Sequence, residues 1–474
     1  MINWLSAVYQ LTLGALALFG LLGAVTLWLF WRHRDEAFPC PPADEASLPA
    51  VTVQLPLYNE RFVVEKLLRD VAALDYPADR LDIQVLDDSD DETTEIAAGV
   101  VRQLSRRGVD IHLFHRPERE GYKAGALQLG LSQARGDYIA IFDADFSPPR
   151  SFLRLTVPHL LSEPRLGLVQ ARWGHMNGES SALTGAQRIA MDKHFALDQT
   201  VRFRADIYPR FNGTGGVWRR SCIEDAGGWE GDTLCEDLCL STRAILRGWE
   251  FRLLNDVVVP AELPASMAAY KSQQARWAKG CSQCLFKFGR AILADGRRPF
   301  LARLYGLLMM AGYWAHPLLI LLLLTLVPLV YLGYQPPSFL LVFGLAGFAQ
   351  PILFVLSQKR LYTDWLKKLR HLPMLILLAI GLAAGTSRAI AEALLGRPNR
   401  PVRTPKGWLE AAAPARAYRL PFDWIIGVEL LLAAYAAVGI AFCLQRDFYS
   451  SLPFLVASAL GFGYVALASL RESL

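Results

Sequence analysis

A long uncharged stretch near the start of the chain limits how the chain can fold. Residues 4–30 contain no charged side chain and are mostly apolar. About 20 apolar residues suffice for a helix to cross a bilayer, so residues 1–34 are predicted to form a transmembrane helix. Arg32, His33 and Arg34 follow directly, as is typical of a cytoplasmic end. The alternative, a cleaved signal peptide, would need a positive start, a shorter apolar run and a small-residue cleavage site, and the stretch shows none of these.

The composition indicates that this stretch is one of several. Hydrophobic residues make up 53% of the chain and charged residues 20%, whereas soluble domains are less apolar and about a quarter charged. Disordered, collagen-like and disulfide-scaffold chains are therefore excluded, and an ordinary soluble enzyme is not expected. Residues 42–300 have a globular composition and hold most of the acidic residues. Further apolar runs follow at 304–335, 336–358, 424–445 and 451–470.

These runs predict five spans, with the N-terminus outside and the globular part and C-terminus in the cytoplasm. The apolar run 372–386 is short for a span and lies between two basic stretches. We therefore expect an interfacial or re-entrant helix over 372–395, followed by a basic loop over 396–423; six spans are the alternative. The predicted divisions are an N-terminal helix (1–34), a catalytic domain (48–265), an amphipathic interface segment (266–302) and a C-terminal membrane bundle (303–474).

Charge and cysteine content exclude some partners. The net charge is only +5, so no general polyanion-binding field and no nucleic-acid partner are expected. Basic residues near the apolar runs are expected to orient the chain and to contact anionic lipid headgroups. Most of the seven cysteines lie in the predicted cytoplasmic part, where disulfides are not expected. Cys281 and Cys284 form a lone CxxC without a second pair, which does not predict a zinc site.

The globular part has the pattern of an α/β domain. Short apolar runs at 51–56, 81–86, 111–114 and 138–142 predict strands, and amphipathic stretches between them predict helices, one of which would open at Asn59-Glu60. This alternation favours a mostly parallel, doubly wound sheet. Ligands of such sheets bind at the carboxyl ends of the strands.

Acidic residues follow two of the predicted strands. Asp143 and Asp145 come directly after the strand 138–142, where paired carboxylates suit Mg²⁺ or Mn²⁺ bound together with substrate phosphates. Asp87 and Asp88 end the strand 81–86 and could accept hydrogen bonds from a nucleotide. Solvated acidic caps are the alternative interpretation of both pairs.

Four more motifs carry side chains suited to sugar-nucleotide chemistry. Lys123 lies between glycines and could face a diphosphate, or it could belong to a surface turn. Residues 211–216 form a Gly-rich turn that allows close backbone approach. Glu236 and Asp237 open a predicted helix, where they could complement the helix dipole or, for Asp237, deprotonate an acceptor. Residues 273–277 end in Arg276 and Trp277, which could clamp a phosphate and face a sugar ring, or form an interfacial belt.

In this order and approximate spacing, the motifs resemble the "D, DxD, ED, QxxRW" signature of processive, membrane-embedded family 2 glycosyltransferases of GT-A fold. The likeness extends to the cellulose-synthase-like mannan and glucan synthases of plants. It covers about residues 50–290 and rests on IQVLDDS (83–89), GYKAGAL (121–127), IFDADF (141–146), LVQARW (168–173), FNGTGGVWR (211–219) and QQARWAKG (273–280).

The resemblance implies a role for each motif residue. Asp237 would be the catalytic base, next to Glu236, and Asp143 and Asp145 would hold Mg²⁺ or Mn²⁺. The nucleotide sugar would be bound by Tyr58, Glu60, Asp87, Asp88, Lys123, Gln273, Arg276 and Trp277. The acceptor would lie against Phe211, Asn212, Gly213, Thr214 and Trp277. Residues 402–406 partly match the gating-loop motif of cellulose synthases.

The expected activity is inverting transfer of a hexose from UDP-glucose or GDP-mannose to form β-linkages. We expect a processive β-glucan or β-mannan synthase, coupled to export, in the inner or plasma membrane. A glycolipid synthase acting on diacylglycerol or a sphingolipid is the first alternative. A non-catalytic transporter or scaffold is the second. The resemblance leaves a homo-oligomer open.

Overall fold

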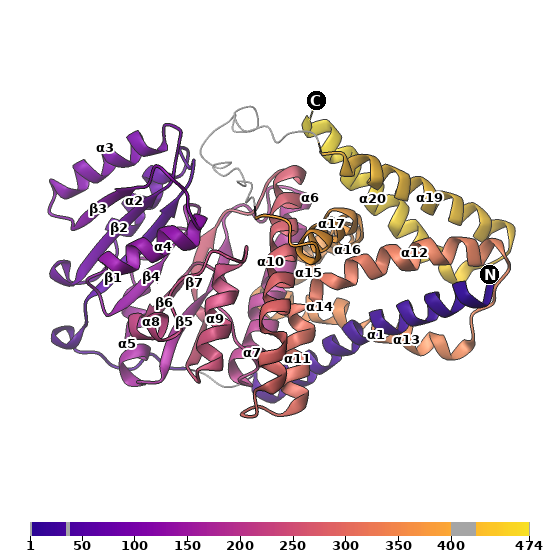
Figure 1. The fold of residues 1–474 in the computed structure, drawn as a ribbon, viewed down its shortest axis with the longest axis horizontal. Coiled ribbons are helices and arrows are strands. Elements are labelled where there is room, and N and C mark those ends of the chain that lie inside the picture. The colour runs from indigo at the N-terminus through magenta and orange to yellow at the C-terminus, as the bar shows by residue number, and fades with distance from the viewer. Residues whose placement is uncertain (1, 35–37, 400–422, 474) are drawn as a thin grey trace.

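The computed structural model describes residues 2–34, 38–399 and 423–473. It has a sheet domain at one end and a group of long helices at the other (Figure 1). The N-terminal helix α1 (Ile2–His33) packs among the C-terminal helices, against α12, α13 and α14. Segments far apart in the chain therefore form one helical bundle.

The sheet has seven strands in the order β3-β2-β1-β4-β6-β5-β7. Their bounds are β1 Val51–Leu57, β2 Leu81–Asp87, β3 Ile111–His115, β4 Tyr138–Ile141, β5 Leu166–His175, β6 Gly216–Arg219 and β7 Glu250–Ala261. The four predicted strands are confirmed as β1 to β4, which all run parallel. Strand β6 is antiparallel to both β4 and β5, so the sheet is mixed.

The register of the sheet places the predicted site residues at one edge. Val51 of β1 pairs with Leu81 of β2 on one side and with Tyr138 of β4 on the other. The strand order therefore reverses at β1, and the carboxyl ends of β1, β2 and β4 lie side by side. Such a reversal is where open α/β sheets bind their ligands.

Helices cover both faces of the sheet, and the side chains of β4 explain why. Alternate residues of a strand face opposite sides. Tyr138 and Ala140 belong to one buried cluster, and Ile139 and Ile141 belong to the other. The helices of this domain are α2 Val64–Ala72, α3 Thr93–Ser105, α4 Tyr122–Gln133, α5 Phe152–Ser162, α6 Ala182–Lys193, α7 Thr200–Arg204, α8 Arg220–Asp225 and α9 Glu236–Leu246, with a π-helical turn at His194–Gln199.

Two helices begin elsewhere than the sequence suggests. Helix α2 begins at Val64 rather than at Asn59-Glu60, because Asn59 has a left-handed backbone (φ 57°) and its side chain bonds Asp90. Helix α4 begins at Tyr122, so Lys123 lies in its first turn and not in a surface turn. The hydrogen bonds between Asn59 and Asp90 join the loops that follow β1 and β2. The start of α4 at Tyr122 places Lys123 at the carboxyl edge of the sheet.

Helix α10 (Met267–Ala294) connects the sheet domain to the bundle, where it contacts α11, α17 and α20. The other bundle helices are α11 Phe300–Met310, α12 Ala315–Tyr331, α13 Leu341–Ala346, α14 Ala349–Leu361, α15 Trp365–Lys368, α16 Leu372–Gly381, α17 Ala383–Leu394, α19 Ile425–Gln445 and α20 Leu452–Ser473.

Within the described residues, five segments are long and apolar enough to cross a membrane: Ile2–His33, Gly312–Tyr331, Val342–Leu361, Ile425–Gln445 and Tyr449–Ser473. They correspond to the five predicted runs, except that the run from Leu304 is divided, and α11 ends before the span begins at Gly312. Helices α16 and α17 meet at a 42° bend, so they form either one broken span, the sixth, or a re-entrant segment. The side of the membrane that each loop faces stays a prediction.

Candidate active site

Lys123 is the centre of a charged cluster at the carboxyl edge of the sheet. Its Nζ lies 2.5 Å from Asp143 Oδ1, 2.9 Å from the Gly213 carbonyl oxygen and 3.6 Å from Glu236 Oε1. Burial lowers the pKa of Lys123, but the carboxylates of Asp143 and Glu236 outweigh it and raise the pKa, so the side chain stays a cation. Three predicted motifs thus meet at one amine.

Asp237 lies next to this cluster at the start of α9. Burial, and then the charge of Glu236, raise the pKa of Asp237 to about 7, although the Leu238 N–H, Lys123 and Arg210 act in the opposite direction. The Leu238 N–H donates to Asp237 Oδ1 at 2.7 Å and orients the carboxylate. A carboxylate that titrates near neutral pH is well matched to proton abstraction.

The Gly-rich turn at residues 211–216 brings its backbone close to both Lys123 and Asp237. Gly213 has φ 84°, and a Cβ there would lie 3.2 Å from Asp237 Oδ2 and 3.5 Å from Lys123 Nζ. Thr214 Oγ1 accepts a hydrogen bond of 2.9 Å from the Asp143 N–H and so ties the turn to the end of β4. Only glycine fits this left-handed position without crowding the base.

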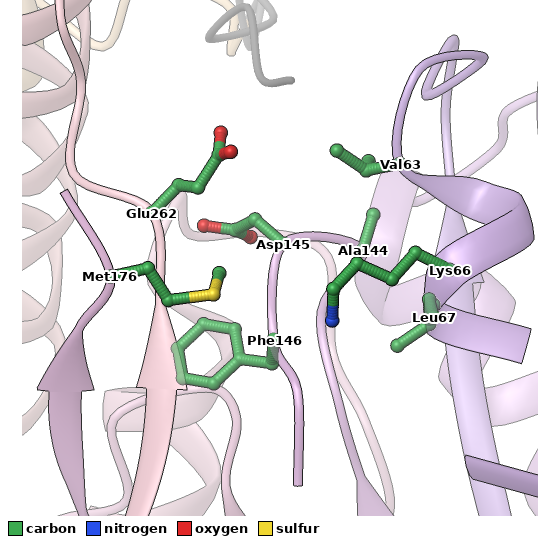
Figure 2. A pocket seen from close by; sticks show the side chains of 8 residues that line it. All are labelled: Val63, Lys66, Leu67, Ala144, Asp145, Phe146, Met176 and Glu262. Carbon is green, nitrogen blue, oxygen red and sulfur yellow. The ribbon is translucent and has the colours of Figure 1, made fainter. Parts of the chain in front are cut away.

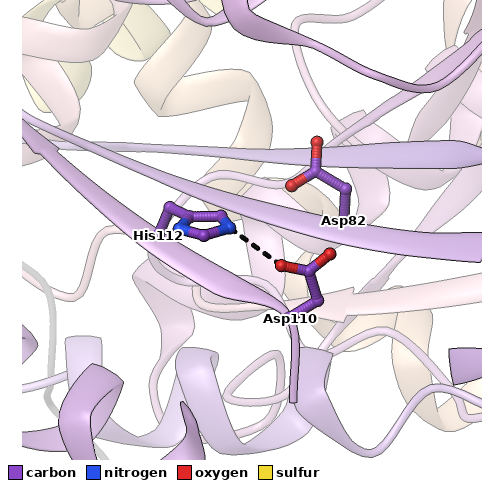
Figure 3. A group of neighbouring side chains, drawn as sticks. All are labelled: Asp82, Asp110 and His112. Atoms are coloured by element: carbon purple, nitrogen blue, oxygen red, sulfur yellow. Dashed lines mark hydrogen bonds and ion pairs between the residues drawn. The ribbon is translucent and has the colours of Figure 1, made fainter. Parts of the chain in front are cut away.

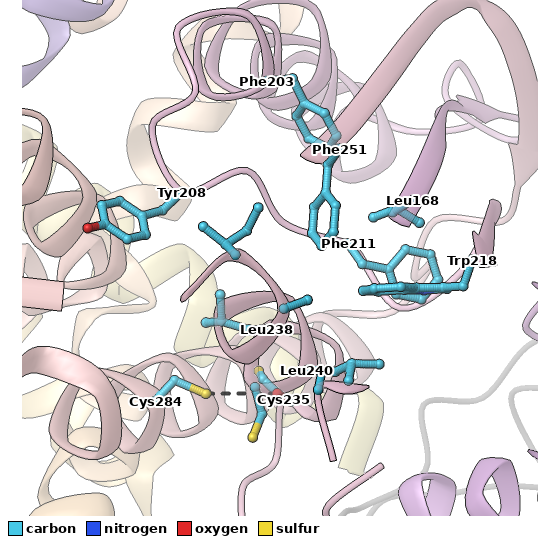
Figure 4. Packing of buried hydrophobic residues seen from close by; sticks show 14 of the residues in the cluster. Leu168, Phe203, Tyr208, Phe211, Trp218, Cys235, Leu238, Leu240, Phe251 and Cys284 are labelled. Carbon is cyan, nitrogen blue, oxygen red and sulfur yellow. Dashed lines mark hydrogen bonds between the residues drawn. The ribbon is translucent and has the colours of Figure 1, made fainter. Parts of the chain in front are cut away.

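The two residues before Gly213 are placed differently from each other. Phe211 is 1% exposed and packs edge-on against Trp218 in the core beneath α9, so it supports the turn and does not line its surface (Figure 4). Asn212 Oδ1 lies 2.9 Å from His194 Nε2 in the π-helical turn. The Asn212 Nδ2 is buried and has no hydrogen-bond partner among the described residues.

Asp145 faces a small cavity of about 60 Å³ beside the end of β4 (Figure 2). Glu262, at the end of β7, and Lys66 line the same cavity, and Glu262 is 5% exposed against 8% for Asp145. Carboxylate oxygens are the ligands that Mg²⁺ and Mn²⁺ prefer, and substrate phosphates commonly supply the remaining ligands. The donor set at Asp143 and Asp145 therefore fits a divalent ion shared with a diphosphate.

Two other groups in the described part of the chain hold three metal-type ligands each: Asp82, Asp110 and His112 (Figure 3), and Glu230, Asp232 and Cys239. A cation already contacts each group. Arg135 bonds Asp82 and Asp110, and Lys287 Nζ lies 2.5 Å from Glu230 and 2.6 Å from Asp232. Protein cations thus already occupy the carboxylate oxygens of both groups.

The ends of β1 and β2 form the part of the site predicted to hold the nucleoside. Asp88 is 5% exposed and accepts two hydrogen bonds, of 2.7 and 2.6 Å, from Arg116. The Arg119 guanidinium lies 3.2 Å from the ring centroid of Tyr58. Asp87 has no exposed surface, and its oxygens bond Thr94, His115 and the Ser89 N–H. Glu60 is half-buried in the turn before α2, and its carbonyl accepts from the N–H groups of Val63 and Val64.

Helix α10 carries the half-buried side chains of Gln273, Arg276 and Trp277. Arg276 Nε is buried and has no hydrogen-bond partner among the residues that the structure describes. The helix packs tightly on the loop that precedes Asp237: a Cβ on Gly280 would lie 2.3 Å from Cys235 Sγ. The structure thus brings the QxxRW helix next to the helix of the base.

Sequence reasoning missed several residues of this region. Arg116 and Arg119 lie on the polar loop after β3, where two arginines three positions apart were the available signal. Arg210, which precedes the Gly-rich turn, acts on the charge of Asp237. In the sequence Asn399 is only one of two candidates for the Phe position of the gating-loop motif, yet its carbonyl accepts from the Tyr122 hydroxyl at 2.9 Å and its side chain bonds Gln283 at 2.8 Å. The predicted gating motif at 402–406 lies outside the described residues.

The chain shows similarity to known proteins over this domain. Residues 49–280 match the family described as "Glycosyltransferase like family 2". The chain is 40% identical over 280 residues to glucomannan 4-beta-mannosyltransferase 1 of Cyamopsis tetragonoloba, covering 58% of this chain and 53% of that protein. It is 38% identical over 291 residues to glucomannan 4-beta-mannosyltransferase 2 of Arabidopsis thaliana, covering 59% and 54%. The chain therefore spans about half the length of the curated relatives it matches.

A solved structure shares the fold. The mannosyltransferase PcManGT of Pyrobaculum calidifontis, in complex with GDP-Man and Mn²⁺, superposes with a TM-score of 0.56 at 22% identity, over 82% of this chain and 100% of that one. The match agrees with the GT-A architecture of the mixed sheet. The chain thus contains a family 2 glycosyltransferase domain of GT-A fold, over residues 49–280, joined to apolar helices long enough to cross a membrane.

Proposed function

We propose that this protein is an inverting β-mannosyltransferase that uses GDP-mannose and extends a β-mannan or glucomannan chain at a membrane. The observation that carries the proposal is Asp237, a half-buried carboxylate with a pKa of about 7, next to the Lys123–Asp143 pair. With a base and a cation this close together, the base can deprotonate the acceptor while the cation stabilises the leaving diphosphate.

The geometry supports a direct displacement. Lys123 and Arg276 would contact the diphosphate, and Tyr58 with Asp88 would hold the nucleoside. Asp237 would take the proton from the acceptor hydroxyl as this oxygen attacks the anomeric carbon. The bond to the diphosphate is α in a nucleotide sugar, so attack from the opposite face forms a β-linkage.

Asp143 and Asp145 would hold Mg²⁺ or Mn²⁺ against the leaving diphosphate. The ion would supply positive charge that stabilises the departing phosphate oxygens. Lys123 serves the same purpose from the protein, because its amine stays charged while bonded to Asp143.

The choice of mannose follows the relatives. Both relatives described above are named glucomannan 4-beta-mannosyltransferases, and the solved mannosyltransferase of the same fold holds GDP-Man with Mn²⁺. UDP-glucose is the competing donor, because glucose and mannose differ at a single hydroxyl. We place the catalytic domain on the cytoplasmic side, where nucleotide sugars are made.

The test uses purified full-length protein in lipid nanodiscs with Mn²⁺ and a β-1,4-mannan oligosaccharide. We expect GDP release from GDP-mannose, and a product that β-mannanase digests. Asp237→Asn should lower transfer by about 10² to 10⁴ and still bind GDP. Faster turnover of UDP-glucose, with a product that β-glucanase digests, would show that glucose and not mannose is transferred. Labelled product that partitions into organic solvent would indicate a lipid acceptor.

A further inference from the structure

Both ends of the QxxRW segment are attached to carboxylates of the membrane bundle. Three glutamates from three bundle helices contact α10: Glu392 of α17, Glu429 of α19 and Glu472 of α20. Their contacts fall at residues 267–268, 271 and 279 of α10, on both sides of residues 273–277. The bundle therefore holds this segment at three points.

The central contact is a buried ion pair. Lys271 Nζ lies 2.8 Å from one oxygen of Glu429 and 2.9 Å from the other, and 3.3 Å from Ser469 Oγ. The side chains of Lys271 and Glu429 are 10% and 0% exposed. An ionisable residue in an apolar membrane helix is costly and usually has a function. Separating the two side chains would leave buried charges without a partner. The pair therefore favours the position of α10 relative to α19 in which Lys271 and Glu429 meet.

The two flanking contacts restrain the start of α10 and the residues after Trp277. Glu472 accepts hydrogen bonds of 2.7 and 2.8 Å from the N–H groups of Met267 and Ala268, which have no partner within their own helix. Lys279, which is 6% exposed, lies 3.4 Å from Glu392. The helix can therefore neither slide nor rotate without breaking at least one of these contacts.

Helix α10 also contacts the loop that precedes the base. Gly280 packs against Cys235, and Gln283 Oε1 accepts a hydrogen bond of 2.9 Å from the Leu234 N–H, just before Glu236 and Asp237. The donor-side groups Lys123 and Asp143 are held instead by the turn at residues 213–214 and by the end of β4. The position of α10, which carries Trp277, thus depends on the bundle, whereas Lys123 and Asp143 are held within the sheet domain.

We propose that Glu429, Glu472 and Glu392 are positioning residues that set Trp277 against Asp237, so that the membrane bundle aligns the acceptor. This inference rests on the proposed function. Such a role would affect two reactions of the same site differently. Hydrolysis of the donor by water needs no aligned glycan, whereas transfer to a glycan does.

The test measures the ratio of transfer to hydrolysis with GDP-[¹⁴C]mannose and mannan oligosaccharide. In Glu429→Gln we expect this ratio to fall roughly tenfold to a hundredfold, since a misplacement of about 1 Å can cost two orders of magnitude in rate. Glu472→Gln, at an exposed contact that a folded protein can lose, should lower the ratio severalfold. The charge-swapped double variant Lys271→Glu/Glu429→Lys should restore the ratio.

Asp447→Asn is the matched control, because Asp447 lies on an exposed loop and bonds only Tyr449 among the described residues. Its ratio should equal that of the wild type. A wild-type ratio in both Glu429→Gln and Glu472→Gln, or a double variant as impaired as Glu429→Gln, would overturn the inference. If the wild-type protein neither transfers nor hydrolyses a nucleotide sugar, the proposed function itself fails before any variant is compared.

Discussion

Replacing Glu236 by Gln should move the pH dependence of sugar transfer to lower pH. Burial raises the pKa of Asp237 to about 7, and the charge of Glu236 is the next largest cause. Glutamine keeps the size of the side chain and removes this charge. We expect the inflection to move down by roughly one pH unit, which corresponds to about 1.4 kcal/mol of repulsion between the two carboxylates.

The shift of the inflection can be measured as a ratio of rates at a single pH. At pH 6, about a tenth of the Asp237 carboxylates are ionised in the wild type, and about half would be ionised in the variant. Relative to its own alkaline plateau, kcat/KM of Glu236→Gln at pH 6 should therefore be about five times that of the wild type. Normalising to each plateau removes any loss of overall rate.

The assay follows GDP release at subsaturating GDP-mannose from pH 5 to 9 at constant ionic strength. Under these conditions kcat/KM reports the ionisation of the free enzyme. Glu224→Gln is the control, because Glu224 is exposed on α8 and pairs with Arg220. A wild-type inflection near pH 4, or an inflection that stays in place or moves to higher pH in Glu236→Gln, would refute the assignment of Asp237 as a base raised by its neighbour.

Three further predictions concern Lys123, Asp145 and Asp237. Lys123→Met removes a cation that lowers the pKa of Asp237, so the inflection should move to higher pH in the same assay. Asp145→Ala should abolish the Mn²⁺-dependent part of GDP-mannose binding in titration calorimetry and leave the metal-independent part; equal binding with and without Mn²⁺ in the wild type would contradict this. Asp237→Asn should lower transfer by about 10² to 10⁴. It should nevertheless raise the melting temperature at pH 8 but not at pH 3, because the raised pKa of Asp237 contributes stability below the unfolded value of 3.8, which is lost as the pH rises through about 7. An unchanged or lower melting temperature at pH 8 would argue against that pKa.

The first four strands were predictable because their signals are local. Each is a short apolar run that ends at a turn or an acidic residue, and the structure confirms them as β1 to β4. Strands β5, β6 and β7 were not delimited beforehand. The position of β6 between β4 and β5 depends on pairing Ile141 with Gly216, 75 positions along the chain, and no local pattern reports such a pairing.

The motifs of the site were identified in sequence, but the surroundings that define their chemistry were not. Asp87 and Asp88 look equivalent in the chain, yet Asp87 is enclosed by Thr94 and His115 while Asp88 receives Arg116. The stacking of Arg119 on Tyr58 joins residues from the ends of different strands. Which carboxylate is enclosed by Thr94 and His115 and which pairs with Arg116 is decided by packing, because these contacts exist only in the assembled layers.

The sequence by itself determined where the apolar spans and the sheet domain lie and which side chains are suited to catalysis and binding. Hydrophobic periodicity and strand-end motifs depend only on residues that are close together in the chain. Only the tertiary structure decided how these side chains act together. The raised pKa of Asp237 arises from burial beside Glu236, and the hold of the bundle on α10 depends on Lys271 meeting Glu429, 158 residues away. Electrostatic interactions strengthen when water is excluded, and that exclusion exists only once the sheet domain and the helices have packed.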